Sequence, residues 1–231
     1  MRVITWNCNL KFKEKFELID SYDPDICFIQ ECEKLKSDFF PNYKYFWTGR
    51  NENKGLGVLT KKNEFFVDET HNKDLINFLP IRSDDLKLLG VWSFNHRASK
   101  FGSEVSGNTI DAINFYKDWF GDNDERCIVA GDFNNSIIWD KKGNDNNFNN
   151  INNHFVDLGF VSNYHKLKNE VFGKESYATF FHTKKESKKY HIDYIYSKNL
   201  NPLELKVGSY TEWISYSCLL YTSPSPRDFQ V

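Results

Sequence analysis

The chain has 231 residues, of which 40% are hydrophobic and 17% aromatic, and its formal net charge is -2. This apolar content supplies a sizeable core, so the composition excludes a chain that is disordered throughout, and the length suits one large domain. The near-neutral net charge excludes a protein that coats nucleic acid through a large net positive charge. It is still compatible with a local basic patch on the surface.

Neither export nor membrane insertion is indicated by the sequence. The start, from Met1 to Asn7, lacks the apolar core and small-residue cleavage site of a signal peptide, and no apolar run reaches membrane-spanning length. The five cysteines are odd in number and have no paired metal-ligand spacing. We therefore expect buried, reduced thiols and a cytoplasmic protein.

The first predicted elements are a strand and a helix. An apolar run over residues 3–6 predicts a buried strand. Phe12, Phe16 and Ile19 follow at helical spacing. This pattern stops near Pro24, because proline removes a backbone donor and restricts the residue before it.

Further strands are predicted through the first half of the chain. Apolar runs over residues 26–29, 56–59 and 86–94 are bounded by polar or turn residues. The aromatic residues between 43 and 47 fit either a surface that stacks bases or a partly buried strand, and we favour the buried strand.

The second half continues the alternation. Ile110, Ile113 and Phe120 lie on a similar helical face. A strand is predicted over residues 127–130, where an apolar run precedes a glycine and an aspartate.

An asparagine-rich run over residues 144–153 fits either a linker or a helix. Apolar residues recur three or four apart from Phe148 to Leu158 and Gly159 follows, so we favour a helix. A last strand is predicted over residues 192–196. Because strands and helices alternate, the sequence predicts an α/β layered architecture.

The amphipathic pattern ends after Ser217. The string that follows, CLLYTSPSPRD, resembles translated adapter sequence, and a Ser-Pro-rich terminus is in any case ordinarily disordered. We expect one domain over residues 1–217 with an incomplete last strand, and a non-native or disordered tail over residues 218–231.

Polar residues end or interrupt four of the predicted strands: Asn7, Glu31, Asp132 and Asp193. Each has an ordinary explanation by itself, such as a turn after a strand or a solvated side chain. Strand ends can also bring side chains from distant parts of a chain to one site. Together the four residues indicate such a site.

The segments around these residues are TWNCNL, DICFIQEC, GLGVLTK, GVWSFNHR, IVAGDFNNS and HIDYIYS. In this order and spacing they resemble the endonuclease/exonuclease/phosphatase superfamily, which includes pancreatic deoxyribonuclease, the exonuclease III group and neutral sphingomyelinases. The resemblance covers about residues 1–217. It implies a four-layer α/β sandwich, in which two mixed β-sheets pack face to face with helices on the outside.

The resemblance also implies roles for individual residues. Glu31 resembles the principal magnesium ligand, and Asn7 the amide that helps to hold the metal or its phosphate. Asp132 resembles the carboxylate that orients or deprotonates the attacking water, and Asn134 the amide that steadies Asp132 and the phosphoryl oxygens. Carboxylate and amide oxygens suit Mg²⁺ or Mn²⁺ and do not form a structural zinc site.

Two further roles follow from the same resemblance. His96 stands where family members often place a histidine or tyrosine that contacts phosphate. Asp193 resembles the aspartate that orients a catalytic histidine near the C-terminus.

One part of the family pattern is absent. Family members normally carry Ser-Asp-His before a final apolar strand, whereas here residues 213–217 read WISYS and lead into Cys218. We assign the missing role to none of the remaining histidines. The sequence therefore predicts a complete water-activating centre but an impaired enzyme in this particular chain.

A lysine-rich stretch over residues 184–189 could bind a nucleic-acid backbone, but we favour a solvated connecting loop.

The function expected from the sequence is metal-assisted in-line attack of water on a phosphodiester, most simply in DNA or RNA. One alternative is a small-molecule or lipid phosphoester hydrolase of the same fold, because substrate choice lies in loops outside the motifs. An alternative of another class is a non-catalytic nucleic-acid-binding relative. We expect a monomer without membrane insertion.

Overall fold

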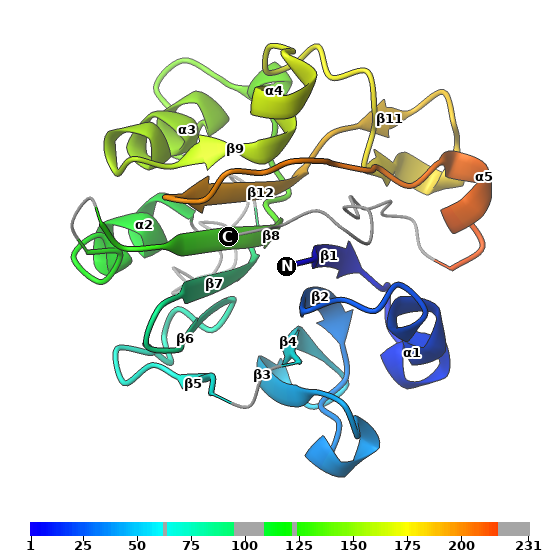
Figure 1. The fold of residues 1–231 in the computed structure, drawn as a ribbon. Coiled ribbons are helices and arrows are strands. Elements are labelled where there is room, and N and C mark those ends of the chain that lie inside the picture. Colours follow the sequence, from blue (N-terminus) through cyan, green and yellow to red (C-terminus); the bar gives the residue numbers. More distant parts are fainter. Residues whose placement is uncertain (62–63, 95–108, 122–123, 217–231) are drawn as a thin grey trace.

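The computed structural model describes residues 1–61, 64–94, 109–121 and 124–216, and its strands form two main sheets (Figure 1). The first sheet has the order β1-β2-β4-β3, with β1 (Val3–Asn7), β2 (Ile26–Cys32), β3 (Lys44–Asn51) and β4 (Lys54–Thr60). The second has the order β5-β6-β7-β8-β12-β9, with β5 (Phe66–Val67), β6 (Phe78–Arg82), β7 (Lys87–Trp92), β8 (Cys127–Asp132), β9 (Val161–Ser162) and β12 (Asp193–Lys198). A separate short pair joins β10 (Phe180–Phe181) to β11 (Lys189–Tyr190).

Both main sheets are mixed. In the first sheet β1 runs parallel to β2, and the other pairs are antiparallel. In the second sheet β7 runs parallel to β8, and the other pairs are antiparallel.

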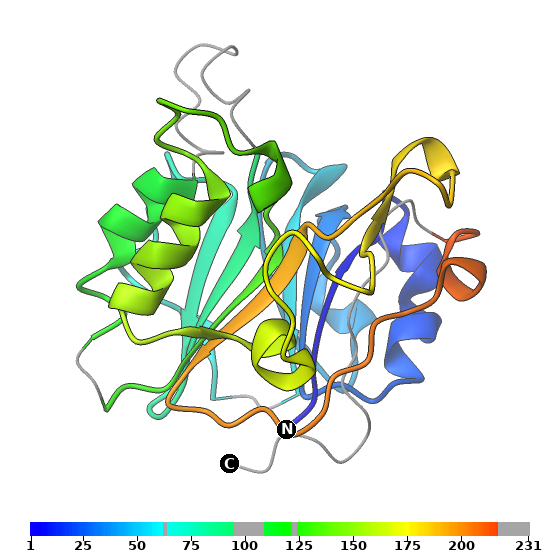
Figure 2. The same ribbon diagram turned by 90° about the horizontal axis from the view of Figure 1, so that it is seen from above.

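Helices cover the outer faces of the two sheets, as Figures 1 and 2 show. The longer ones are α1 (Phe12–Asp20) against the first sheet, and α2 (Thr109–Tyr116) and α3 (Phe148–Asp157) against the second. Shorter helical segments are η1 (Ser37–Phe39), η4 (Ile137–Trp139), α4 (Asn163–Lys168), η5 (His182–Lys184) and α5 (Tyr210–Trp213). The predicted four-layer α/β sandwich is confirmed.

The central strands of the second sheet are buried on both faces. Ile128 and Ala130 of β8 belong to the core that includes the space between the sheets, whereas Val129 packs with the helices outside. In β12, Ile195 likewise faces the first sheet and Tyr196 faces the helices. Burial on both faces explains why these strands read as continuous apolar runs.

The predicted strands and helices are present, and several strands extend further than their apolar runs. β1, β2 and β8 continue to Asn7, Cys32 and Asp132, so the polar site residues lie within the strands and are held by their ladders. The aromatic segment between 43 and 47 forms part of β3, as favoured. The asparagine-rich run is helical from Phe148 onward, where it forms the first part of α3, whereas residues 144–147 precede the helix.

The sequence pattern missed β6 and the shortest strands. β6 contains Pro80, which lacks a backbone N–H group and argues against an interior strand. Its carbonyl oxygen instead accepts a hydrogen bond from the Asp68 N–H group at 3.1 Å. β9, β10 and β11 have two residues each, which is too short for an alternation to be visible.

Other predictions concern the surface and the thiols. Lys184–Lys189 are exposed, as expected for a solvated connection. Four cysteines are buried and free: Cys8, Cys27, Cys32 and Cys127. Cys218, the boundary at Ser217 and the tail over residues 218–231 lie outside the described residues. Within the described ranges, no helix is long and apolar enough to cross a membrane.

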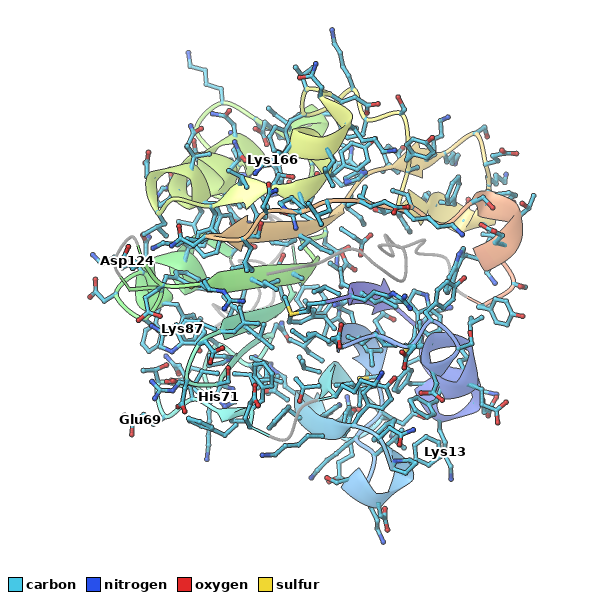
Figure 3. All side chains as sticks on the ribbon, viewed as in Figure 1. Lys13, Glu69, His71, Lys87, Asp124 and Lys166 are labelled. Atoms are coloured by element: carbon cyan, nitrogen blue, oxygen red, sulfur yellow. The ribbon has the colours of Figure 1, made fainter. Side chains whose placement is uncertain are left out.

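Charged side chains of both signs surround the molecule. Figure 3 shows Lys13, Glu69, Asp124 and Lys166 projecting from its outside. This mixture agrees with the small net charge of -2.

Candidate active site

Strand register brings the polar strand-end residues to one edge of the sandwich. β1 and β2 are parallel, with Asn7 beside Gln30, the neighbour of Glu31. β8 and β12 are antiparallel, with Asp132 directly opposite Asp193. A hydrogen bond from Asn7 Nδ2 to Asp132 Oδ2, 3.0 Å long, joins the two sheets at this edge.

The alternation of side chains directs both aspartates into the space between the sheets. Asp132 shares a face of β8 with Ile128 and Ala130, which belong to the core on that side. Asp193 shares a face of β12 with Ile195 of the same core. Two carboxyl groups thus take the place that apolar side chains occupy further along the strands.

Glu31 lies at an irregularity of the first sheet. The register between β2 and β4 shifts between Gln30 and Cys32, so Glu31 is the extra residue of a β-bulge, and its φ is 60°. Its side chain is 20% exposed and forms an ion pair with Lys54 Nζ at 2.9 Å. A bulge next to a site re-aims a side chain, and here it leaves the Glu31 carboxylate accessible at the sheet edge.

Asp132 is buried and held on both carboxylate oxygens. Oδ2 accepts the hydrogen bond from Asn7, and Oδ1 accepts one from the Asn134 N–H group at 2.8 Å. Burial raises the pKa of Asp132 above the ordinary range of a carboxyl group, the two hydrogen bonds lower it, and the negative charge of Glu31 raises it again. An aspartate with a raised pKa is a stronger proton acceptor than one in water.

A tight turn after β8 fixes the position of Asp132. Asn134 has a φ of 46°, a left-handed conformation that asparagine tolerates better than most residues. Its side-chain Nδ2 donates to the Ser93 carbonyl oxygen at 2.9 Å, and Ser93 Oγ donates to the Phe133 carbonyl oxygen at 2.5 Å. Asn134 therefore steadies Asp132 through its backbone, while its side chain anchors the turn to the end of β7.

Gly131 is needed for a close approach between strands. A Cβ atom at this position would lie 1.8 Å from the Val91 carbonyl oxygen of β7. The glycine before Asp132 therefore lets β7 and β8 pack closely at the site.

Asp193 is a buried carboxyl group with unsatisfied oxygens. Both Oδ1 and Oδ2 lack a hydrogen-bond partner among the described residues. Burial raises the pKa of Asp193 well above its ordinary value, and the charge of Asp132 raises it further. The Thr179 hydroxyl group acts on this pKa in the lowering direction. Thr179 Oγ1 also accepts a hydrogen bond from the Asp193 backbone N–H group at 3.1 Å, which anchors the strand end.

The unsatisfied oxygens and the donor set fit a hard divalent cation. A buried acceptor without a partner is costly, and a cation or a proton donor would satisfy it. Within the described ranges, no three His, Cys, Asp or Glu side chains come together as a protein cage. Mg²⁺ usually keeps several waters and binds one or two carboxylates plus a substrate phosphate, which suits Glu31 with the amide oxygen of Asn7.

The structure brings together Asn7, Glu31, Asp132, Asn134 and Asp193 through the contacts and registers described above. The predicted phosphate-contacting residue His96 lies outside the described residues.

Lys54, Ser93 and Thr179 contact this group and were not singled out in the sequence. Lys54 directly precedes the GLGVLTK segment and Ser93 lies within GVWSFNHR, so both could have been found by inspecting those segments. Thr179 has no local signal, because its contact depends on the tertiary fold.

His191 does not serve Asp193 as an imidazole partner. Its ring packs against Tyr164 and Tyr194, at centroid distances of 4.5 and 5.0 Å. Its Nδ1 lies 2.8 Å from the Tyr177 carbonyl oxygen.

The fold is similar to those of DNA-processing proteins of known structure. A 3′-5′ exonuclease (NExo) from Neisseria meningitidis matches with a TM-score of 0.71 and 15% sequence identity, over 97% of this chain and 99% of that chain. An AP endonuclease from Archaeoglobus fulgidus matches with a TM-score of 0.73 and 14% identity, over 100% of both chains. A D146N form of the 3′ phosphatase NExo from Neisseria, bound to a product DNA hairpin, has a TM-score of 0.73 and 15% identity, over 100% of both chains.

Sequence comparison gives the family. No curated protein matches the chain in sequence. A sequence profile of the Endonuclease/Exonuclease/phosphatase family, however, matches residues 4–223, which is most of the chain. The protein therefore belongs to the endonuclease/exonuclease/phosphatase family of phosphoester hydrolases.

Proposed function

We propose that this protein is a Mg²⁺- or Mn²⁺-dependent phosphodiesterase that hydrolyses DNA or RNA. The observation that carries the proposal is the buried Asp132 carboxylate, hydrogen-bonded by Asn7 and Asn134 beside a second aspartate. Structural relatives whose names identify them as an exonuclease and an AP endonuclease support nucleic acid as the substrate. Free, buried cysteines support the cytoplasm as its location.

In this proposal each residue has a separate task. Glu31 and the Asn7 amide oxygen hold the divalent cation, which when bound polarises the phosphoryl group and offsets its negative charge. Asp132 orients the attacking water and accepts its proton, for which each carboxylate oxygen has a second lone pair beyond its existing hydrogen bond. Asn134 and Ser93 keep Asp132 in place.

Asp193 is proposed to stabilise positive charge near the leaving group. A buried carboxylate with two unsatisfied oxygens binds an imidazolium or another cation strongly. Among the described residues no histidine ring is hydrogen-bonded to it.

The test compares the wild type with Asp132→Asn in a plasmid-nicking assay, with and without Mg²⁺. The substitution keeps the shape of the side chain but removes the proton acceptor, so the Mg²⁺-dependent rate should fall by about 10²-fold or more. Circular dichroism checks that the variant is folded. Equal rates for the two proteins would refute the role of Asp132.

The same assay separates the alternative functions. A small phosphodiester and a phosphomonoester are offered beside the plasmid, and preference for either would favour small-molecule hydrolysis. If no substrate is turned over with any divalent cation, while a labelled oligonucleotide still binds, the protein is a non-catalytic nucleic-acid-binding relative.

A further inference from the structure

One cationic side chain contacts the proposed metal ligand. Lys54 opens β4 and its Nζ atom lies 2.9 Å from Glu31 Oε2. The same ammonium group lies over the Trp92 ring, 5.4 Å from its centroid. Because Glu31 belongs to the first sheet and Trp92 to the second, Lys54 spans the opening between the sheets at the site.

Lys54 is therefore close to the reaction centre. Trp92 is the register partner of Asp132 in the parallel pair of β7 and β8. The two side chains therefore project side by side from the same face of the sheet. The Lys54 ammonium group lies over this ring and beside Glu31, the carboxylate to which the proposed function assigns the metal.

The local backbone fixes this placement. Lys54 is followed by Gly55, which lies opposite Cys32 across the bulge that contains Glu31. A Cβ atom at Gly55 would lie 2.3 Å from the Thr48 carbonyl oxygen and 2.4 Å from the Trp47 ring. This close packing brings the start of β4 against the bulge and sets Lys54 beside Glu31.

Stability does not explain the ion pair. The Lys54 side chain is 40% exposed, and exposed pairs of this kind contribute little to folding. A second pair, between Lys34 after β2 and Glu52 in the turn between β3 and β4, has almost the same geometry but lies outside the site. Lys34 Nζ is 2.9 Å from Glu52 Oε1 and 6.0 Å from the centroid of the Trp47 ring.

We propose that Lys54 is a substrate-binding residue that exchanges one anionic partner for another. In the free protein its ammonium group pairs with Glu31. Once Glu31 coordinates the divalent cation, the ammonium group donates a hydrogen bond to a non-bridging oxygen of the substrate phosphate. This inference rests on the proposed function, because it takes Glu31 as a metal ligand and a phosphodiester as the substrate.

The exchange makes two predictions of opposite sign. Lys54 competes with the divalent cation for Glu31, so its removal tightens metal binding in the absence of substrate. Lys54 also neutralises one phosphate, so its removal weakens nucleic-acid binding and reduces the salt dependence of that binding. A lysine that merely held Glu31 in position would give looser metal binding and an unchanged salt dependence.

The experiment uses the full chain in five forms: wild type, Lys54→Met, Lys54→Arg, Glu31→Gln and the matched control Lys34→Met. Calorimetric titration with Mn²⁺ should show tighter binding to Lys54→Met, by up to about fivefold, the strength of an exposed ion pair. Fluorescence anisotropy with a labelled oligonucleotide and Ca²⁺ should show about tenfold weaker binding, as for the loss of one charge-assisted hydrogen bond. The slope of log affinity against log salt should fall by about one.

The controls decide between outcomes. Lys54→Arg should restore oligonucleotide binding and the salt slope, and Lys34→Met should behave as the wild type in both titrations. Weaker Mn²⁺ binding by Lys54→Met, or an unchanged salt slope, overturns the assignment of Lys54. If instead the wild type and Glu31→Gln bind Mn²⁺ equally, Glu31 is not the metal ligand. This result refutes the proposed function and is distinct from the results that refute the role of Lys54.

Discussion

Two residues of the candidate site adopt left-handed backbone conformations, Glu31 with a φ of 60° and Asn134 with a φ of 46°. Such a conformation costs a residue other than glycine about 1–2 kcal/mol, and it persists where the surrounding structure enforces it. Here a bulge enforces it at Glu31 and the turn anchored to Ser93 enforces it at Asn134. Glu31 lies one residue before the end of β2, and Asn134 lies two residues after the end of β8, which carries the candidate carboxylate Asp132.

Gly131 offers a test of how tightly β7 and β8 must pack. In Gly131→Ala the new methyl group would meet the Val91 carbonyl oxygen at 1.8 Å, so the strands must separate. We expect a loss of about 3 kcal/mol or more in the free energy of unfolding, measured in urea. The control is Gly143→Ala, where φ is 79° and no atom lies within 4 Å of the added Cβ. This change should cost only about 1–2 kcal/mol of backbone strain.

His191 makes a measurable contribution to the pH dependence of stability. Burial lowers the pKa of His191 to about 4. The hydrogen bond to Tyr177 and the negative charge of Glu175 raise this pKa, but their effect is smaller than that of burial. Because the Tyr177 carbonyl oxygen can only accept, Nδ1 carries the proton of a neutral ring. The unfolded chain, with an ordinary histidine pKa of about 6.5, takes up a proton below that pH while the folded protein does not until about pH 4.

Stability should therefore fall as the pH is lowered from about 6.5 to about 4, by about 3 kcal/mol in total from His191. Urea unfolding at pH 7 and pH 5 measures this loss. His191→Asn retains a donor for Tyr177 but does not titrate, so it should lose less stability over this interval. Asp132 and Asp193, whose pKa values are raised, act in the opposite direction in both proteins. An identical pH dependence in the two proteins would exclude this contribution of His191.

At the scale of the element, α1 depends on a residue that is distant in sequence. The residue before the helix, Lys11, has a φ of 54° and provides no side-chain cap. The Glu33 carboxylate accepts hydrogen bonds from the Phe12 and Lys13 N–H groups, at 2.8 and 2.9 Å. A negative charge at this end of a helix also interacts favourably with the helix dipole.

Removal of this cap should destabilise the protein. Glu33→Ala leaves two N-terminal N–H groups of α1 without their partner, and we expect a loss of about 1–2 kcal/mol in the free energy of unfolding. The matched control is Glu17→Ala, an exposed position on the same helix, which should change stability by less than about 0.5 kcal/mol. If both variants lose the same amount, the cap is not the cause.

At the scale of the whole molecule, the candidate site joins the two sheets. Asn7 and Glu31 belong to the first sheet, and Asp132 and Asp193 belong to the second. A hydrogen bond from Asn7 to Asp132 links these two pairs directly. A cation bound at this edge would reduce the repulsion between carboxylates from both sheets and would stabilise the sandwich as a unit.

Divalent cations should therefore raise the thermal stability of the wild type. At Mg²⁺ concentrations about 100 times the dissociation constant, the expected gain is about 2.7 kcal/mol. Differential scanning fluorimetry should show this shift for the wild type and a much smaller one for Glu31→Gln. Glu52→Gln is a matched control, because Glu52 also pairs with a lysine at 2.9 Å but lies outside the site. A shift that persists in Glu31→Gln would place the cation elsewhere.

The layered α/β fold and the main strands could be predicted from the sequence. Strands that are buried on both faces are apolar along most of their length, so they appear in the sequence as short apolar runs. Six strands could be predicted in this way: β1, β2, β4, β7, β8 and β12. The polar residues that end or follow such runs, including Asn7, Glu31 and Asp132, stood out because they interrupt this pattern. Elements without a local pattern were missed, such as the short strands and β6 with its proline.

The contacts that hold the site together could not be predicted from the sequence and depend on the tertiary fold. The Asn7–Asp132 hydrogen bond, the pair of Asp132 with Asp193, and the Lys54–Glu31 contact all join residues from different strands. Their geometry depends on strand register, on the bulge at Glu31 and on the packing of one sheet against the other. No local sequence pattern encodes these relations, because they arise from contacts between segments that are far apart in the chain.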